Sequence, residues 1–301
     1  MPPSVRTVLI SSALVVGLGL AGCGSGDDGS PSTDTQASAP VVAKDDALAA
    51  MVPAAIADDG VLSIGTDASY APNEFIDTDG TTIIGFDAEL ATALGQVLGL
   101  RSELTNAPFD SLVEGVKNGK YELGVSSFTI NADRQEQVDM VSYFNAGTSW
   151  AVPKGNPNGI TPDDACGRKV AVQKGTVQVD DITARSKACT DAGKQAITIE
   201  QYQLQSDATA AVVSGKDDAM LADSPIVAYA ITQTGDKLEK VGEMYDAAPY
   251  GVAVPKGQGD YTKAIQGAMQ QLIDSGAYRQ ILDAWKVSEG AVTTSEVNPI
   301  S

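Results

Sequence analysis

Residues 126–134, SSFTINADR, place hydroxyl groups, an amide and a guanidinium directly after the apolar, strand-like residues 121–125. Polar groups at the carboxyl ends of strands bind ligands in open α/β sheets. The sequence contains no histidine and no evident close pair of carboxylates with separated pKa values, so these groups favour ligand binding over acid–base catalysis. The alternative for Arg134 is a surface position, paired with Asp133 or Glu136 on one helical turn.

The region around this segment recurs later in the chain. Residues 116–127 align with residues 212–223, because each contains a helix end, Gly-Lys, an acidic residue, a short apolar strand and a polar residue at its end. The alignment places Ser127 opposite Asp223. Either a common helix–turn–strand unit recurs by chance, or two similar α/β lobes each present polar groups to a ligand between them. Asp223 precedes Ser-Pro, so its alternative role is to cap a helix.

Hydrophobic periodicity assigns the surrounding residues to alternating strands and helices. Short apolar runs predict strands at residues 61–65 and 169–172, and amphipathic patterns predict helices at residues 86–94, 110–118 and 204–214. Strands that alternate with helices imply parallel sheets and an α/β fold.

The residues that follow the first strand of each predicted lobe are expected to line the same cleft. These are residues 66–70 in the first lobe and residues 173–177 in the second. Gly175 and Thr176 precede a predicted helix, whose free N–H groups suit a carboxylate or another anion.

The N-terminal residues have the pattern of an export signal. Residues 1–22 carry one early cation and an uncharged run that is too short for a membrane span. Leu-Ala-Gly followed by Cys23 resembles the lipobox of bacterial lipoproteins, in which this cysteine receives the lipid. The alternative is an ordinary cleaved signal followed by an unrelated cysteine. The Gly-, Ser-, Asp- and Pro-rich residues after Cys23 predict a flexible tether.

Charge and cysteine usage exclude several classes of function. The net charge of −19 argues against binding of nucleic acid or anionic lipid, which requires clustered Lys and Arg. With Cys23 assigned to lipid, Cys166 and Cys189 remain as an even pair, which favours one disulfide in an exported protein. Two distant thiols without histidine are too few ligands for a metal site. We therefore expect no metal and no cofactor.

The motifs together resemble the family three extracellular solute-binding proteins of bacteria, the receptor components of polar amino acid ABC importers. They occur in the expected order, at residues 65–70, 85–90, 109–110, 119–120, 129–134, 172–176 and 222–225. The resemblance implies two lobes joined by two crossover strands, near residues 149–153 and 250–255. The implied domains are residues 1–22 (signal peptide), 23–50 (tether), 51–148 with 252–287 (lobe one), 149–251 (lobe two) and 288–301 (C-terminal tail).

The resemblance also implies which residues bind the ligand. They are Asp67, Tyr70, Phe109, Ser126, Ser127, Thr129, Arg134, Gln173, Val177 and Asp223. Arg134 would bind the α-carboxylate through two hydrogen bonds, and Asp223 would pair with the α-ammonium group. Thr129 and the serines would add hydrogen bonds, and the Val177 N–H would reach the carboxylate.

The remaining predicted residues would contact the ligand side chain. Tyr70 and Phe109 would enclose its aliphatic part, although both are also plausible as core aromatics, and Asp67 and Gln173 would contact its end. Glu74 is open to two interpretations, a structural role or a ligand contact. Asn73 stands where relatives usually carry an aromatic residue.

The predicted function is that of a lipid-anchored receptor on the outer face of the cell membrane, which delivers an amino acid to an ABC permease and is not an enzyme. Asp67 favours a polar or cationic ligand, whereas Lys174 near the rim leaves an acidic one open. The alternatives are a dehydratase-like enzyme on the same scaffold and a sensor domain, which would require a membrane-spanning segment after the lobes.

Overall fold

The computed structural model describes residues 40–300. The predicted signal peptide, Cys23 and residues 23–39 of the predicted tether lie outside the described residues. Residues 40–50, the last part of that tether, include helix α1 (Asp46–Ala49), which Asp45 caps. The N–H of Val42 donates to Gln96 Oε1 at 2.8 Å. This part of the chain therefore packs on the fold.

Eight strands form one sheet in the order β5-β1-β6-β11-β7-β10-β8-β9. β1 lies parallel to β5 and β6, and β8 lies parallel to β9 and β10, whereas β7 and β11 pair antiparallel with their neighbours. The strands are β1 (Val61–Thr66), β5 (Arg101–Asn106), β6 (Leu123–Thr129), β7 (Asp139–Pro153), β8 (Lys169–Gln173), β9 (Thr198–Tyr202), β10 (Ala219–Asp223) and β11 (Leu238–Val254).

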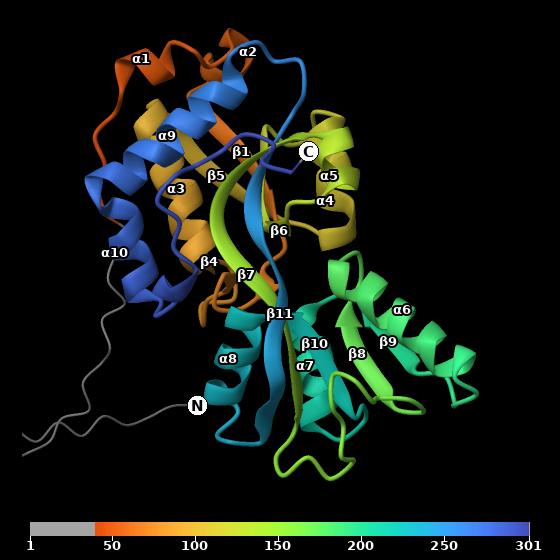
Figure 1. The fold of residues 1–301 in the computed structure, drawn as a ribbon. Coiled ribbons are helices and arrows are strands. Elements are labelled where there is room, and N and C mark those ends of the chain that lie inside the picture. The colour runs from red at the N-terminus through yellow and green to blue at the C-terminus, as the bar shows by residue number, and fades with distance from the viewer. Residues whose placement is uncertain (1–39, 301) are drawn as a thin grey trace, which may run out of the picture. The chain divides into compact units, whose positions relative to one another are not determined.

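The two long strands β7 and β11 connect two groups of elements, which confirms the predicted two-lobe α/β fold with two crossover strands (Figure 1). Lobe one contains β1, β5 and β6, and lobe two contains β8, β9 and β10. The helices of lobe one are α1, α2 (Ala54–Ala57), α3 (Phe86–Leu98), α4 (Phe109–Lys117), α5 (Ala132–Gln137), α9 (Tyr261–Ser275) and α10 (Ala277–Ala284), followed by a 3-10 turn, η1 (Ser288–Gly290). Those of lobe two are α6 (Val177–Asp191), α7 (Gln205–Val213) and α8 (Ser224–Gln233).

The helices follow the apolar periodicity of the sequence. In the predicted helix α4, Leu112 and Val116 are buried on one face, and the apolar face of α3 packs into the main core of lobe one. α3 ends where Gly99 adopts a φ of 72°, a left-handed conformation that glycine takes without a Cβ penalty. No helix within residues 40–300 is long and apolar enough to cross a membrane.

Strand β6 continues further than its sequence predicts. The apolar residues 121–125 indicate a strand that ends before the hydroxyl run, but β6 extends to Thr129. Phe128 and Thr129 still pair with Gly251 and Tyr250 of β11, and the serines before them are buried. The hydroxyl groups therefore lie within the strand, because pairing with β11 outweighs the polar character of these residues.

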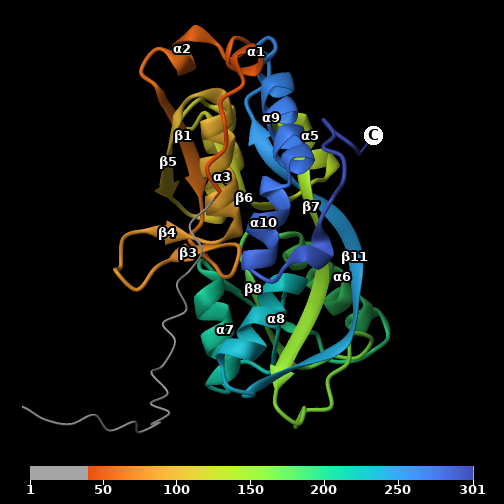
Figure 2. The same cartoon turned by 90° about the vertical axis from the view of Figure 1, so that its left-hand side faces the viewer.

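A small antiparallel sheet lies beside the main one. It consists of β2 (Ser69–Tyr70), β3 (Glu74–Ile76) and β4 (Ile83–Ile84). Figure 2 shows it next to α7 and α8, where the ring of Phe75 lies 6.1 Å from that of Tyr229 in α8. This sheet belongs to lobe one and holds Tyr70 against lobe two.

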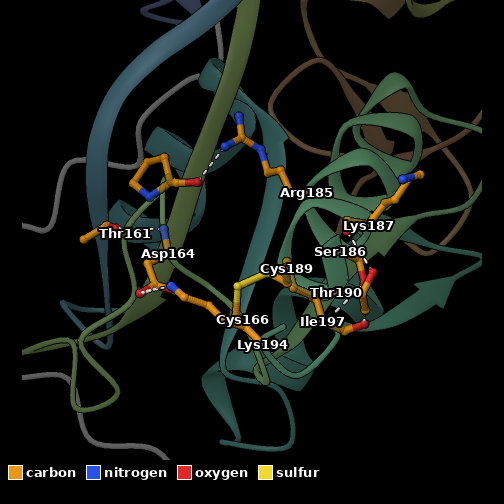
Figure 3. Close-up of a disulfide and its surroundings, with 11 residues drawn as sticks. Thr161, Asp164, Cys166, Arg185, Ser186, Lys187, Cys189, Thr190, Lys194 and Ile197 are labelled. Carbon is orange, nitrogen blue, oxygen red and sulfur yellow. Dashed lines mark hydrogen bonds and ion pairs between the residues drawn. A yellow bond between two sulfur atoms is a disulfide. The ribbon is translucent and has the colours of Figure 1, made fainter. Parts of the chain in front are cut away.

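The predicted disulfide between Cys166 and Cys189 is present (Figure 3). It joins the segment after β7 to α6, in a part of lobe two where Lys194 pairs with Asp164 at 3.1 Å.

Candidate functional site

Asp223 is the last residue of β10 and lies at the centre of the site. Its side chain is 5% exposed. Oδ2 accepts hydrogen bonds from the hydroxyl groups of Tyr70 at 2.9 Å and Tyr250 at 2.8 Å, and Oδ1 accepts one from Gln178 Nε2 at 2.8 Å. Burial raises the pKa of Asp223, whereas these hydrogen bonds and the charge of Arg134 lower it. Asp223 precedes α8 but makes no capping hydrogen bond with its side chain, so the capping alternative is wrong.

Arg134 enters the site from α5 of lobe one. Asn131 caps this helix by accepting the N–H of Arg134 at 2.9 Å. The guanidinium donates to the carbonyl oxygen of Thr129 at 2.7 Å and, across the lobes, to that of Gly175 at 3.2 Å. The side chain is 8% exposed and pairs with neither acidic neighbour on α5, so the surface alternative is wrong.

Two aromatic rings support the guanidinium of Arg134. Its central carbon lies 5.3 Å from the ring centre of Phe109 and 5.7 Å from that of Phe128, and these two rings stack on each other. Such cation–π contacts stabilise a desolvated cation. Burial lowers the pKa of Arg134 to about 10, and the charge of Asp223 opposes this shift. Arg134 therefore remains cationic at neutral pH.

Residues of both lobes line a cavity between Arg134 and Asp223. The lining residues are Tyr70, Phe109, Ser127, Thr129 and Arg134 from lobe one and Thr176, Val177, Gln178 and Asp223 from lobe two. The cavity volume is about 10 Å³, enough for roughly one water molecule. An amino acid can enter only if the two sets of residues move apart.

Asp67 and Gln173 meet beside this cavity, not in its lining. Asp67 Oδ2 accepts hydrogen bonds from the Phe109 N–H at 2.9 Å and from Gln173 Nε2 at 3.1 Å. Its Oδ1 accepts the hydroxyl of Ser69 at 2.6 Å. Burial raises the pKa of Asp67, and the hydrogen bonds from Ser69 and Phe109 lower it. Asp67 and Gln173, which are both predicted to contact the ligand side chain, thus form one hydrogen-bonded contact between the lobes.

The rim of the cleft carries a second set of contacts between the lobes. Lys174 pairs with Asp110 at 2.7 Å, and Gln203 Nε2 donates to the same carboxylate at 3.0 Å. Gly175 has a φ of 83°, and a Cβ built on it would lie 2.7 Å from Cβ of Asp110. This close approach depends on a glycine at position 175.

Ser126 and Ser127 lie next to each other but make different contacts. Ser127 lines the cavity. The hydroxyl of Ser126 accepts the N–H of Asp67 at 3.0 Å and donates to Glu74 at 2.7 Å. Glu74 is buried behind the serines, does not line the cavity, and shares the hydroxyl of Ser127 with Asp87. The expectation of no close carboxylate pair is therefore wrong, because two distant segments bring Glu74 and Asp87 together.

Three contacts in the site have no direct signal in the sequence. Tyr250 and Gln178 both bind Asp223, and the carbonyl oxygen of Gly175 binds Arg134. Residues 175–178 begin α6, and Tyr250 lies in a predicted crossover strand, so the segments were identifiable although these contacts were not. The binding roles of the predicted residues stay predictions.

Comparison with known proteins identifies a family and several relatives. Residues 62–288 match the family described as "Bacterial extracellular solute-binding proteins, family 3". The arginine-binding protein ArgT of Corynebacterium glutamicum is 39% identical over 83% of this chain and 82% of its own length. The ABC transporter glutamine-binding protein GlnH of Bacillus subtilis is 27% identical over 88% of this chain and 91% of its own.

A solved structure has the same fold. The ancestral amino acid-binding protein AncCDT-1, described as a precursor of cyclohexadienyl dehydratase, matches with a TM-score of 0.69 and 30% identity. The match covers 77% of this chain and 97% of that protein.

Proposed function

Because the chain belongs to family 3 of the bacterial extracellular solute-binding proteins, we propose that it is a receptor that binds a polar amino acid between its two lobes. One observation carries the proposal: Arg134 of lobe one and Asp223 of lobe two are buried and line the same cavity. An amino acid taken out of water needs an opposite charge for its carboxylate and another for its ammonium group.

Each buried charge receives one end of the ligand in this proposal. Arg134 binds the α-carboxylate, and the N–H of Val177, the first residue of α6, adds a donor with the favourable dipole of a helix N-terminus. Asp223 binds the α-ammonium group. Tyr250 and Gln178 hold the Asp223 carboxylate in place, and the ring of Tyr70 contacts the ligand stem. Ser127 and Thr129 supply further hydrogen bonds from lobe one.

Arginine is the first candidate ligand. The 39% identical relative is named for arginine, and the buried Asp67 carboxylate with Gln173 beside it offers acceptors for a cationic or amide side chain. Glutamine is the second candidate, because the Bacillus subtilis relative is named for it. An acidic ligand fits less well because Asp67 would repel it.

We also propose that the receptor works on the outer face of the cell membrane with an ABC permease. The family description places its members outside the cell, and one relative is named as part of an ABC transporter. Cys23 carries the lipid in this proposal, residues 1–22 are the signal peptide and residues 23–39 are the tether. Replacing Cys23 with Ser should release the protein into the medium, and continued membrane retention would contradict lipidation.

The proposed function involves no catalysis. The ancestral protein related to a dehydratase makes an enzyme the second candidate. The sequence contains no histidine to transfer protons. An enzyme would have to use carboxyl groups instead, such as those of the buried Glu74 and Asp87. Incubation with the bound amino acid, followed by mass spectrometry, decides between the two: the receptor returns the ligand unchanged, whereas an enzyme forms a product.

A thermal-shift panel of the twenty amino acids tests the proposed function. A ligand that binds only the folded state stabilises it by RT ln(1 + [L]/Kd). We expect the largest increase in melting temperature with arginine or glutamine. The proposal fails if no amino acid shifts the melting temperature at millimolar concentration.

A further inference from the structure

Ser127 has an unusual backbone conformation for a residue inside a strand. Its φ is 51°, in the left-handed region that few residues other than glycine adopt. Such a conformation persists only when surrounding contacts impose it, and it often occurs at ligand sites. Ser127 lines the cavity between the lobes, so its conformation determines which groups face the ligand.

Asp87 supplies the main contacts that fix Ser127. One carboxylate oxygen of Asp87, Oδ2, accepts the N–H of Ser127 at 2.8 Å and its hydroxyl at 3.0 Å. The same oxygen accepts the hydroxyl of Tyr143 at 2.7 Å, and that hydroxyl also accepts the Ser127 N–H at 3.1 Å. Asn73 Nδ2 donates to the Ser127 hydroxyl at 2.7 Å.

Glu74 extends this cluster toward Asp67. Its Oε2 lies 3.3 Å from the hydroxyl of Ser127, and its Oε1 accepts the hydroxyl of Ser126 at 2.7 Å. Ser126 in turn accepts the N–H of Asp67. A continuous set of hydrogen bonds therefore joins Asp87 to the residue proposed to contact the ligand side chain.

Glu74 and Asp87 are 1% and 0% exposed, and neither takes part in a salt bridge within residues 40–300. Glu74 and Asp87 contact the same hydroxyl, that of Ser127, and form no ion pair there with any described residue. The two carboxyl groups do not both ionise, because desolvation and mutual repulsion disfavour the second charge. Asp87 has the N–H, the serine hydroxyl and the tyrosine hydroxyl as donors, so it is the group that the surroundings stabilise as an anion.

The pKa directions agree with this assignment. Burial raises the pKa of Glu74 well above its ordinary value, and the charge of Asp87 raises it further. Burial raises the pKa of Asp87 to about 6, while hydrogen bonds from Tyr143, Ser127 and Glu74 lower it. The other titratable groups that act on the pair are Asp67, Tyr70, Tyr143 and Tyr278.

We propose that Asp87 and Glu74 are positioning residues of the binding site: an ionised Asp87 holds Ser127 in its left-handed conformation, and a neutral Glu74 holds Ser126 against Asp67. The inference rests on the proposed function, because it assigns these two residues to the same binding site. Neither side chain lines the cavity, so both act through the serines.

The affinity test compares Glu74→Gln with Asp87→Asn at pH 7.5. Glutamine has the shape of a protonated glutamate, so Glu74→Gln should weaken binding less than Asp87→Asn does. Asparagine removes the charged acceptor of two hydrogen bonds from Ser127, so Asp87→Asn should weaken binding about tenfold or more. The opposite ranking, or equal losses, overturns the assignment.

The pH dependence of affinity separates this role from a general structural one. The parent should bind more weakly as pH falls through about 6, because Asp87 then becomes protonated. Tyr143→Phe removes a hydroxyl that donates to ionised Asp87, so the midpoint should move to higher pH, and Asp87→Asn should lose this transition. Losses that are uniform across pH in both variants overturn the proposal. If Asp87→Asn does not fold, the shift of the midpoint in Tyr143→Phe alone tests the role of Asp87.

A ligand-free experiment tests the pair without the proposed function. Because the folded-state pKa of Glu74 is raised, its contribution to stability is fully present below its ordinary value of 4.5 and is lost as pH rises. Glu74→Gln lacks this loss, so its melting temperature relative to the parent should increase from pH 4.5 to pH 8. If the difference in melting temperature stays constant with pH, the assignment of a neutral Glu74 beside an ionised Asp87 is wrong. If the parent binds no amino acid at any pH, the proposed function fails, and this ligand-free measurement still tests the assignment.

Discussion

The hydroxyl group of Tyr70 donates a hydrogen bond of 2.9 Å to Asp223, which lies 153 positions later in the chain. This contact joins the small sheet of lobe one to the last residue of β10 in lobe two. It also occupies the oxygen of Asp223 that Tyr250 contacts. A ligand ammonium group that binds Asp223 therefore shares this carboxylate with two tyrosines or displaces Tyr70.

Substitutions of Tyr70 distinguish its ring from its hydroxyl group. Tyr70→Phe keeps the ring that is proposed to contact the ligand stem and removes the two hydrogen bonds of the hydroxyl with Asp223, one to its carboxylate and one from its N–H. The affinity should therefore stay within about threefold of the parent. Tyr70→Ala removes the ring as well and should weaken binding by about a hundredfold, since fully burying an aromatic ring contributes about 2–3 kcal/mol. Calorimetric titration measures both. Equal effects of the two substitutions would show that the ring does not contact the ligand.

The geometry of the Arg134 guanidinium is expected to matter as much as its charge. Arg134→Lys keeps a cation but loses the planar fork that contacts Thr129 and Gly175 and is proposed to bind the ligand carboxylate, so it should weaken binding at least about tenfold. Arg134→Ala should abolish binding. Arg279→Ala is the matched control, because Arg279 is exposed on α10 and pairs with Asp283 outside the site. Unchanged affinity in Arg134→Ala would refute the proposal that Arg134 binds the α-carboxylate of the ligand.

The close approach of Gly175 to Asp110 makes closure sensitive to a single methyl group. Gly175→Ala places a Cβ against Asp110 only when the lobes are together, so it should weaken ligand binding and expand the ligand-bound protein in small-angle X-ray scattering. Gly193→Ala is the control, since Gly193 has a similar φ of 73° but no atom within 4 Å of the added Cβ. Both variants should lose about 1 kcal/mol of stability from the backbone. Equal affinities in the two variants would mean that this contact does not form on closure.

The disulfide is expected to support stability and not ligand binding. It lies among residues of lobe two that do not line the cavity. Replacing Cys166 and Cys189 with Ser should lower the free energy of unfolding by roughly 3 kcal/mol in the loop-entropy model. The affinity at 10 °C should remain unchanged, as measured by calorimetry. A tenfold loss of affinity in a folded variant would place the disulfide in the binding mechanism.

Much of the fold and part of the site can be predicted because they depend on patterns within short segments of the sequence. The periodicity of residues 86–94 and 110–118 predicted two helices, and the repeat that aligns Ser127 with Asp223 predicted two lobes. Asp223 is recognisable because it ends an apolar strand, and Arg134 because it ends the polar run that follows another apolar segment.

The missed contacts depend on the packing of distant segments. Tyr250 reaches Asp223 from a strand whose register shifts between Tyr250 and Gly251, and no sequence pattern specifies this irregularity. Glu74 and Asp87 lie on β3 and α3, so their proximity depends on how the small sheet packs against that helix. The extension of β6 to Thr129 likewise depends on its pairing with β11.

The central claim is that Arg134 and Asp223 together form a clamp that binds the carboxylate and the ammonium group of an amino acid. The most direct test of this clamp is a calorimetric titration with two related ligands. One is the amino acid that gives the largest thermal shift, and the other is the amine that lacks only its α-carboxylate, such as agmatine for arginine. The clamp predicts saturable binding of one amino acid per chain and a loss of at least about a hundredfold for the amine, because Arg134 is then left buried without its partner. Equal affinity for the two ligands would contradict it.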